Sequence, residues 1–137
     1  MFQHEIKIRV RYAETDQMGY VYYGNYATYF EVARVEAFRE IGFTYKELEE
    51  SGIGMPVLEY KTKYLGPAKY DDLLTVKVSI PEMPGVRIRY EYEVTDESGK
   101  VLNQAETTLV FIKMENGRPT RLPEDFEKLM RKYFKES

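Results

Sequence analysis

The 137-residue sequence contains no cysteine and only one histidine, His4. The absence of cysteine excludes disulfides, zinc ribbons and thiolate nucleophiles, and it favours a reducing, cytoplasmic compartment. A serine triad needs a well-placed histidine, and His4 lies at the extreme N-terminus. No group of side chains has the spacing of metal ligands, so no metal is expected.

Long apolar runs and blocks of like charge are also missing. No stretch approaches the roughly 18 apolar residues of a membrane span. The N-terminal segment MFQHEIKIRVRY is interrupted by charges too often for a signal peptide. The 20 basic and 23 acidic residues are interspersed and give a net charge of −3. Because a nucleic-acid-binding surface needs clustered basic charge, nucleic acid is not an expected partner.

Length and patterning favour a single domain over residues 1–137. A chain of this size can bury roughly two thirds of its unfolded surface without crosslinks. No repeat, linker or low-complexity segment divides it. Five segments have the alternating or apolar character of strands and are separated by turn residues such as DESG. These segments are 5–12, 57–65, 73–80, 86–95 and 101–113.

Residues 23–41 are expected to form one long helix. Apolar residues occupy nearly all of its faces, which predicts burial on most sides. Gly24 or Asn25 would lie at its N-cap, and Gly42 would end it. Two shorter helices follow: one after Thr44, whose spacing to Glu47 is that of a capping box, and one at the C-terminus. The latter places four apolar side chains on one face: Phe126, Leu129, Met130 and Tyr133.

The order of elements is therefore strand, long helix, four strands and short helix. Consecutive strands with short links favour an antiparallel sheet. We expect an α+β protein in which one curved antiparallel sheet wraps around one long central helix, which is the hot-dog fold.

A denser pattern runs from Tyr12 to Arg34: Y-x-x-x-D-x-x-G-x-V-Y-Y-x-N-Y-x-x-Y-F-E-x-A-R. Together with the element order, YDDLLTV at 70–76 and GRPTRLP at 117–123, it resembles the 4-hydroxybenzoyl-CoA thioesterase (YbgC-like) family of hot-dog acyl-CoA thioesterases. The resemblance spans most of the chain.

The resemblance implies a catalytic set. Asp16 matches the family's catalytic carboxylate, acting as nucleophile or general base. Tyr23 matches the position whose backbone N–H points at the thioester oxygen at the start of the long helix. That role is physically sensible, because a helix N-terminus offers unpaired N–H groups and partial positive charge to an oxyanion. Gly19 would let the loop pass close to the ligand without a Cβ, and Glu31 matches a second family acid that would orient water.

Simpler structural explanations exist for the same residues. Asp16 resembles the many loop aspartates that only hydrogen-bond their own turn. Glu31 is followed by Arg34 at the i+3 position, so the two side chains would form an ion pair on the helix. The tyrosines that follow Gly19 are typical of a core or an interface, where the ring is buried and the hydroxyl reaches water or a polar group.

Coenzyme A enters as part of the substrate, and no separate cofactor is expected. Its phosphates need cations, and arginine suits them best. The candidates are Arg118, Arg121, Arg87, Arg89 and Lys63.

The leading functional hypothesis is hydrolysis of a small acyl- or aryl-CoA thioester. A second hypothesis places the acyl group on acyl carrier protein, and a third is non-catalytic binding of an acyl-CoA or a partner protein. Open sheet edges are normally paired or protected. A homodimer is therefore expected. The resemblance implies that the active site lies between its subunits, and members of the family often stack two such dimers into a homotetramer.

Overall fold

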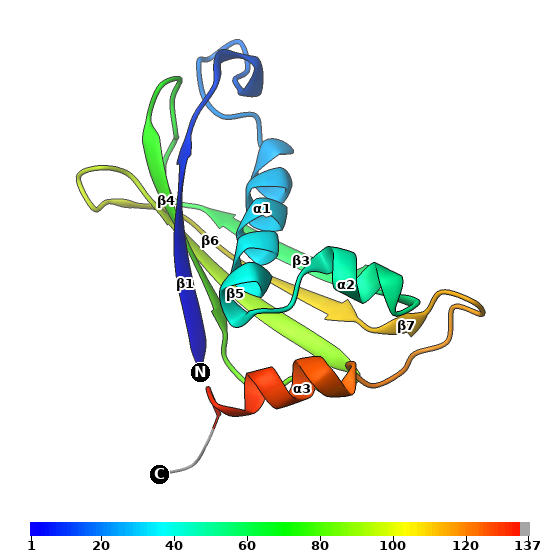
Figure 1. Ribbon diagram of the computed structural model, residues 1–137. Helices are drawn as coiled ribbons and strands as arrows, with labels where there is room; N and C mark the ends of the chain where they lie inside the picture. The colour runs from blue at the N-terminus through cyan, green and yellow to red at the C-terminus, as the bar shows by residue number, and fades with distance from the viewer. Residues whose placement is uncertain (135–137) are drawn as a thin grey trace.

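The computed structural model describes residues 1–134, and their main element is a five-stranded antiparallel sheet (Figure 1). Its strand order is β1-β4-β5-β6-β3. The strands are β1 (Phe2–Arg9), β3 (Val57–Tyr64), β4 (Leu73–Ile80), β5 (Arg87–Thr95) and β6 (Val101–Val110). Two short strands, β2 (Ile53–Gly54) and β7 (Ile112–Lys113), pair separately. The predicted α+β class and antiparallel pairing are confirmed.

Two strand predictions need correction. The first strand begins at Phe2 rather than at residue 5, because the Phe2 side chain is buried and the strand pairs with the whole length of β4. The chain then leaves the sheet through a 3-10 turn, η1 (Tyr12–Glu14). The predicted strand 101–113 is interrupted at Phe111, whose fully buried ring contacts Phe126.

Helix α1 (Asn25–Ile41) packs on one face of the sheet, against β1 and β4. Its buried residues recur with helical spacing at Tyr26, Tyr29, Phe30, Ala33, Arg34, Ala37, Phe38 and Ile41. The opposite face is exposed and includes Glu31 and Val32, which is 42% accessible. Burial of the helix on most sides is therefore not found within one chain, because a five-stranded sheet covers only one side of it.

The ends of α1 follow from local sequence. Gly24 is the N-cap residue and has no side chain to cap the helix, while Asn25 is already helical. The helix ends at Gly42, which adopts φ +99, a left-handed conformation that glycine reaches without a Cβ penalty. The amide of Gly42 donates to the Phe38 carbonyl over 2.9 Å.

Two shorter helices complete the fold. Helix α2 (Tyr45–Glu50) starts with the predicted capping box, in which the Glu47 amide donates to the Thr44 hydroxyl over 3.1 Å. Helix α3 (Glu124–Arg131) runs across the end of the sheet beside the N-terminus of β1 (Figure 1). Phe126 and Met130 of α3 are fully buried, as its apolar face predicted. No helix in residues 1–134 has the length and apolar content needed to cross a membrane.

Candidate active site

Asp16 lies in a tight hairpin between η1 and α1, closed by a bridge between Thr15 and Val21. The Asp16 amide donates to the Tyr20 carbonyl over 2.8 Å, and Oδ1 of Asp16 accepts from the amides of Met18 at 2.9 Å and Tyr20 at 3.2 Å. Within residues 1–134, Oδ2 accepts no hydrogen bond. The loop therefore orients the carboxylate and leaves one oxygen available.

A second loop has the same backbone geometry. In the turn from Asp96 to Lys100, Oδ1 of Asp96 accepts from the amides of Ser98 at 2.9 Å and Lys100 at 3.0 Å. Gly99 adopts φ +85, as Gly19 adopts φ +76. Both loops read Thr-Asp-x-x-Gly in the sequence. The hydrogen bonds around Asp16 are thus those of an ordinary hairpin turn, and its special feature must be its surroundings.

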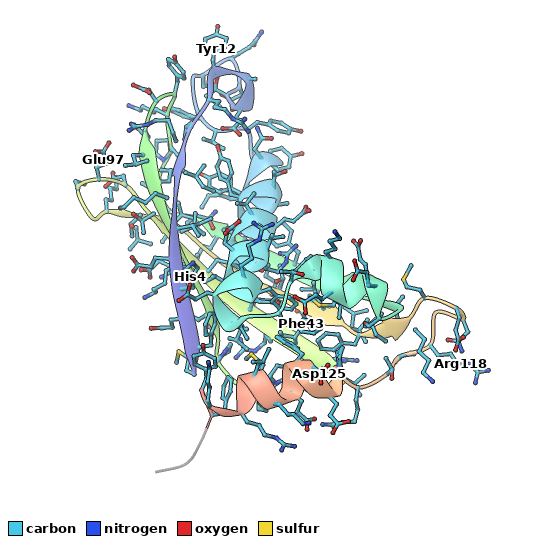
Figure 2. All side chains as sticks on the ribbon, in the orientation of Figure 1. His4, Tyr12, Phe43, Glu97, Arg118 and Asp125 are labelled. Atoms are coloured by element: carbon cyan, nitrogen blue, oxygen red, sulfur yellow. The ribbon has the colours of Figure 1, made fainter. Side chains whose placement is uncertain are left out.

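What distinguishes the Asp16 loop is its attachment to α1 through Glu14. The Glu14 carbonyl accepts from the Tyr22 amide at 2.9 Å and from Nδ2 of Asn25 at 2.8 Å. Its buried carboxylate accepts from the Tyr29 hydroxyl at 2.9 Å and from the Arg11 amide at 2.8 Å. These bonds hold the loop against the first turns of the helix. By contrast, Figure 2 shows Glu97, in the other loop, at a separate corner of the molecule from Tyr12.

Glu14 was not among the predicted site residues. Its signal in the sequence was weak, because an acid two positions before Asp16 has no helical or strand periodicity to identify it. Only the fold brings Asn25 and Tyr29 back onto it, one helical turn apart on α1.

Glu14 makes stability depend on pH. Burial opposes its ionisation, but hydrogen bonds from Arg11 and Tyr29 outweigh burial and lower the pKa of Glu14 below its ordinary value. A carboxylate with a depressed folded pKa stabilises the protein above its unfolded pKa of about 4.3, and this stabilisation is lost as pH falls through the folded value. We expect Glu14→Gln to lower the free energy of unfolding by about 1–3 kcal/mol at pH 7.

Urea unfolding at pH 7 and pH 3 measures this effect. The gap between wild type and Glu14→Gln should shrink at pH 3, because the stabilisation by the Glu14 carboxylate is lost as pH falls below the unfolded pKa and through the depressed folded pKa. The exposed Glu50 provides the control, since Glu50→Gln should leave stability nearly unchanged at both pH values. An equally large Glu14→Gln effect at pH 3 would contradict the assignment.

The start of α1 presents free amides beside this loop. The Asn25 amide donates to the Tyr22 carbonyl and the Tyr26 amide to the Tyr23 carbonyl. Within the described residues, the amides of Tyr23 and Gly24 have no hydrogen-bond acceptor. The Tyr23 side chain is 65% exposed and its ring lies 4.7 Å from that of Tyr22, outside the core. Tyr23 therefore offers the backbone donor that the resemblance implied, while its side chain is not needed for the fold.

Gly19 is explained by conformation rather than by space. A Cβ at this position would meet no protein atom within 4 Å, so packing within one chain does not require glycine here. That glycine makes room for a ligand stays a prediction. Its φ of +76 is the reason for glycine, because other residues are strained in the left-handed region.

We expect Gly19→Ala to lower the free energy of unfolding by about 1 kcal/mol, and Gly99→Ala to do the same in the matching turn. Urea titrations of both variants measure these losses. Because only Gly19 positions Asp16, thiol release from an acyl-CoA should slow in Gly19→Ala and stay at the wild-type rate in Gly99→Ala. Equal rates in both variants would argue against a role for the Asp16 loop.

Glu31 and Arg34 do not form the predicted ion pair. Glu31 is exposed on the open face of α1, whereas Arg34 lies on the sheet side and is 8% exposed. Nη1 of Arg34 donates to the Tyr92 hydroxyl over 2.9 Å. The prediction failed because spacing along a helix does not tell which face is covered. Glu31 remains accessible to a ligand or to another chain.

Two of the predicted phosphate-binding cations are already paired with carboxylates. Arg89 lies on β5 with its Nε 2.8 Å from Glu82 and its Nη1 3.3 Å from Glu106. Arg121 is 2.7 Å from Glu127 of α3. Both side chains would have to exchange these partners to bind coenzyme A.

The other three candidates are exposed, form no ion pair within residues 1–134, and come from different elements. Arg87 begins β5, Lys63 lies on β3, and Arg118 follows β7 at the tip of a long loop (Figure 2). One chain does not bring them together into a phosphate site. The described residues also contain no cluster of three acidic or histidine side chains that would hold a metal ion.

Two hollows in the surface lie away from Asp16 and Tyr23. One, of about 560 Å³, lies on the sheet and is lined by charged side chains including Lys61, Lys77 and Glu91. The other, of about 640 Å³, separates α2 from β2 and β7 and is mainly apolar. Neither is lined by the predicted catalytic residues, so a single chain carries these residues on an open surface.

Comparison with known proteins assigns the family. Residues 10–130 match the thioesterase-like superfamily. The chain is 32% identical over 120 residues to the protein YneP of Bacillus subtilis, covering 88% of this chain and 87% of that one. It is 31% identical over 119 residues to the acyl-CoA thioesterase YbgC of Haemophilus influenzae, covering 86% and 87%.

A solved structure shows the same architecture. The DHNA-CoA thioesterase of Staphylococcus aureus superposes with a TM-score of 0.91 at 33% identity, covering 100% of this chain and 98% of the other. Its hot-dog fold matches the α+β arrangement and the five-stranded antiparallel sheet found here. The chain therefore belongs to the thioesterase-like superfamily, a family of thioester-hydrolysing enzymes, as the pattern from Tyr12 to Arg34 predicted.

Proposed function

We propose that this protein is an acyl-CoA thioesterase that hydrolyses small acyl- or aryl-CoA thioesters. One observation carries the proposal: a carboxylate with a free oxygen, Asp16, and two free amides, those of Tyr23 and Gly24, lie on the two arms of one hairpin. The names of the similar proteins support the same reaction class.

The chemistry follows from these groups. The thioester oxygen accepts hydrogen bonds from the free amides, where the helix N-terminus stabilises the charge that develops on it. Asp16 then either attacks the carbonyl carbon or removes a proton from a water that attacks it. In both routes the carbon–sulfur bond breaks, coenzyme A leaves as its thiol, and one water supplies the oxygen and protons of the products. A single turnover in ¹⁸O-water labels Asp16 only if it is the nucleophile.

A thiol-release assay with purified protein tests the function. Short, long and aromatic acyl-CoAs are compared with the same acyl groups on acyl carrier protein. Turnover of acyl-CoAs is expected, and faster cleavage of the acyl carrier protein substrates would select the second hypothesis. If coenzyme A ligands bind and no thioester is cleaved, the protein is a binding module and the proposal fails. The cytoplasmic location stays a prediction.

Assembly is part of the proposal, because the cations for coenzyme A are dispersed in one chain. Strand β3 is a sheet edge with exposed apolar side chains, such as Val57 at 49% and Leu58 at 52%. The open face of α1, with Val32 and Glu31, is unpartnered as well. We propose a homodimer that covers both surfaces and completes the site between subunits. Two such dimers would stack into a tetramer.

Sedimentation velocity tests the dimer. We expect Leu58→Lys to weaken the assembly by at least tenfold in Kd, about 1.4 kcal/mol, because a charge on a strand edge blocks pairing. Val86→Lys is the control, since Val86 is 40% exposed and precedes β5, which β6 separates from the β3 edge. A wild-type monomer, or a dimer that tolerates Leu58→Lys, would contradict this arrangement.

A further inference from the structure

Helix α1 carries a buried cation that the proposed reaction does not use. Arg34 is 8% exposed and, within residues 1–134, its guanidinium forms no ion pair with a carboxylate. One hydrogen bond, from Nη1 to the Tyr92 hydroxyl, is present, and the buried Nε has no partner. An unpaired buried charge is strongly unfavourable. A negative charge close to the Arg34 guanidinium would therefore stabilise this arrangement.

The groups around Arg34 are hydroxyls, and two of them lack partners. The Tyr90 ring lies 5.9 Å from Cζ of Arg34, and the hydroxyls of Tyr90 and Tyr45 are buried without a hydrogen bond. The Tyr92 hydroxyl is already engaged with the Thr107 hydroxyl at 2.6 Å. The Tyr45 hydroxyl lies close enough to Arg34 and to the Tyr90 hydroxyl that each affects its pKa, but none of these contacts has the geometry of a hydrogen bond. Arg34 Nε, Tyr45 and Tyr90 are therefore three donors without a well-formed acceptor around one positive charge.

The tyrosines do not supply the missing charge themselves. Burial raises the pKa of Tyr90, of Tyr92 and of Tyr45, and the neighbouring Arg34 only partly opposes each rise. All three are therefore neutral phenols near pH 7. The carboxylate of Glu31 also contributes to the raised pKa of Tyr45, but within residues 1–134 it forms no hydrogen bond or ion pair with the cluster. The cluster therefore lacks a hydrogen-bond acceptor that carries negative charge.

We propose that Arg34, Tyr45 and Tyr90 form an internal binding site for one small anionic group, a carboxylate or an ion of halide size. The guanidinium supplies the charge, and the two phenol hydroxyls orient toward the anion once it is present. A larger tetrahedral anion such as sulfate would leave oxygens without donors in these apolar surroundings, among them Phe30, which stacks on Tyr92 at 4.3 Å.

Two sources share this chemistry. Tyr45 also lines the 640 Å³ groove between α2 and β2, with apolar side chains including Leu48, Met55 and Ile112. An anion reaches the cluster either alone from solvent or as the charged end of an organic acid whose apolar body lies in that groove. The second source, if the acid is an acyl group of the substrate, rests on the proposed function. The first does not.

Bromide tests the site without any turnover. Wild-type and Arg34→Met crystals are soaked in sodium bromide, and anomalous difference maps are compared at residue 34. A bromide peak between Arg34, Tyr45 and Tyr90 is expected in wild type, and none in Arg34→Met. Replacing a buried charge by an apolar side chain of similar volume is often tolerated. If Arg34→Met fails to fold, Tyr45→Phe serves instead, and the peak should weaken severalfold.

Acyl-CoAs separate the two sources. An acyl-CoA with a terminal carboxylate is compared with an uncharged acyl-CoA of equal length in wild type and Arg34→Met. A preference for the charged acyl group that falls at least tenfold in Arg34→Met assigns the site to the substrate, while a bromide peak without such a preference assigns it to a free anion. Absence of both would overturn the proposal. If no acyl-CoA is cleaved, the proposed function fails, but the bromide result still decides the site.

Discussion

Asp16→Asn is expected to reduce acyl-CoA turnover by about 10²- to 10⁴-fold, the range that a positioned acid or base contributes. Asparagine keeps an oxygen that accepts the hydrogen bonds from the Met18 and Tyr20 amides, so the hairpin should persist. What is lost is the charge, and with it the ability to attack the thioester or to accept a proton from water. Thiol release gives kcat/KM, and thermal unfolding checks the fold.

The matching turn supplies a close control. Asp96→Asn changes the same residue type in a turn with the same Thr-Asp-x-x-Gly sequence. The amides of Ser98 and Lys100, two and four positions after the aspartate, donate to its Oδ1 as those of Met18 and Tyr20 do in the Asp16 loop. Its turnover should equal that of wild type, because this turn joins β5 to β6 and does not lead into α1. A near wild-type rate in Asp16→Asn, or an equal loss in Asp96→Asn, would refute the catalytic assignment.

Phe126→Ala is expected to lower the free energy of unfolding by about 3–5 kcal/mol, as for other fully buried rings. The Phe126 ring is inaccessible and lies 4.7 Å from the ring of Phe38, 5.3 Å from Phe43 and 6.3 Å from Phe111. It connects α3 to the end of α1 and to the break between β6 and β7. Its removal leaves a cavity that none of these elements can fill. Urea unfolding measures the loss.

Leu129 provides the comparison within the same helix. It is only partly buried, so Leu129→Ala should cost clearly less than Phe126→Ala. Comparing the two variants separates the loss in free energy of unfolding that is due to the Phe126 contacts from the general effect of an alanine in α3. A loss below about 1 kcal/mol for Phe126→Ala would mean that α3 is not part of the folding core.

Elements with strong local signals were predicted nearly to the residue. The alternation in VRIRYEYEVT predicted β5, and the DESG turn correctly joined it to β6. Gly42 ended α1 at the predicted position, and Thr44 began α2 with its capping box. Each of these features depends on residues only a few positions apart, so the local sequence is sufficient to predict it.

The site was predicted unevenly, and the reason is physical. Asp16 and Gly19 were recognisable because a turn is a local structure. Glu14, which attaches that turn to α1, was missed because its partners Asn25 and Tyr29 return to it only in the folded chain. The Glu31–Arg34 pair was wrong because the sheet, not the helix, decides which side is buried.

By itself, the sequence determined most of the strand positions, the end of α1, the start of α2, the DESG turn and the family, since periodicity and turn chemistry act over a few residues. The tertiary structure decided which charges are buried, which are paired and which surfaces stay open. It placed Arg34 beside Tyr90 and Tyr92 without a carboxylate, and it paired Arg89 with glutamates from other segments. Such contacts join residues that are distant along the chain, and their energy depends on burial, which exists only after the sheet and the helix have met.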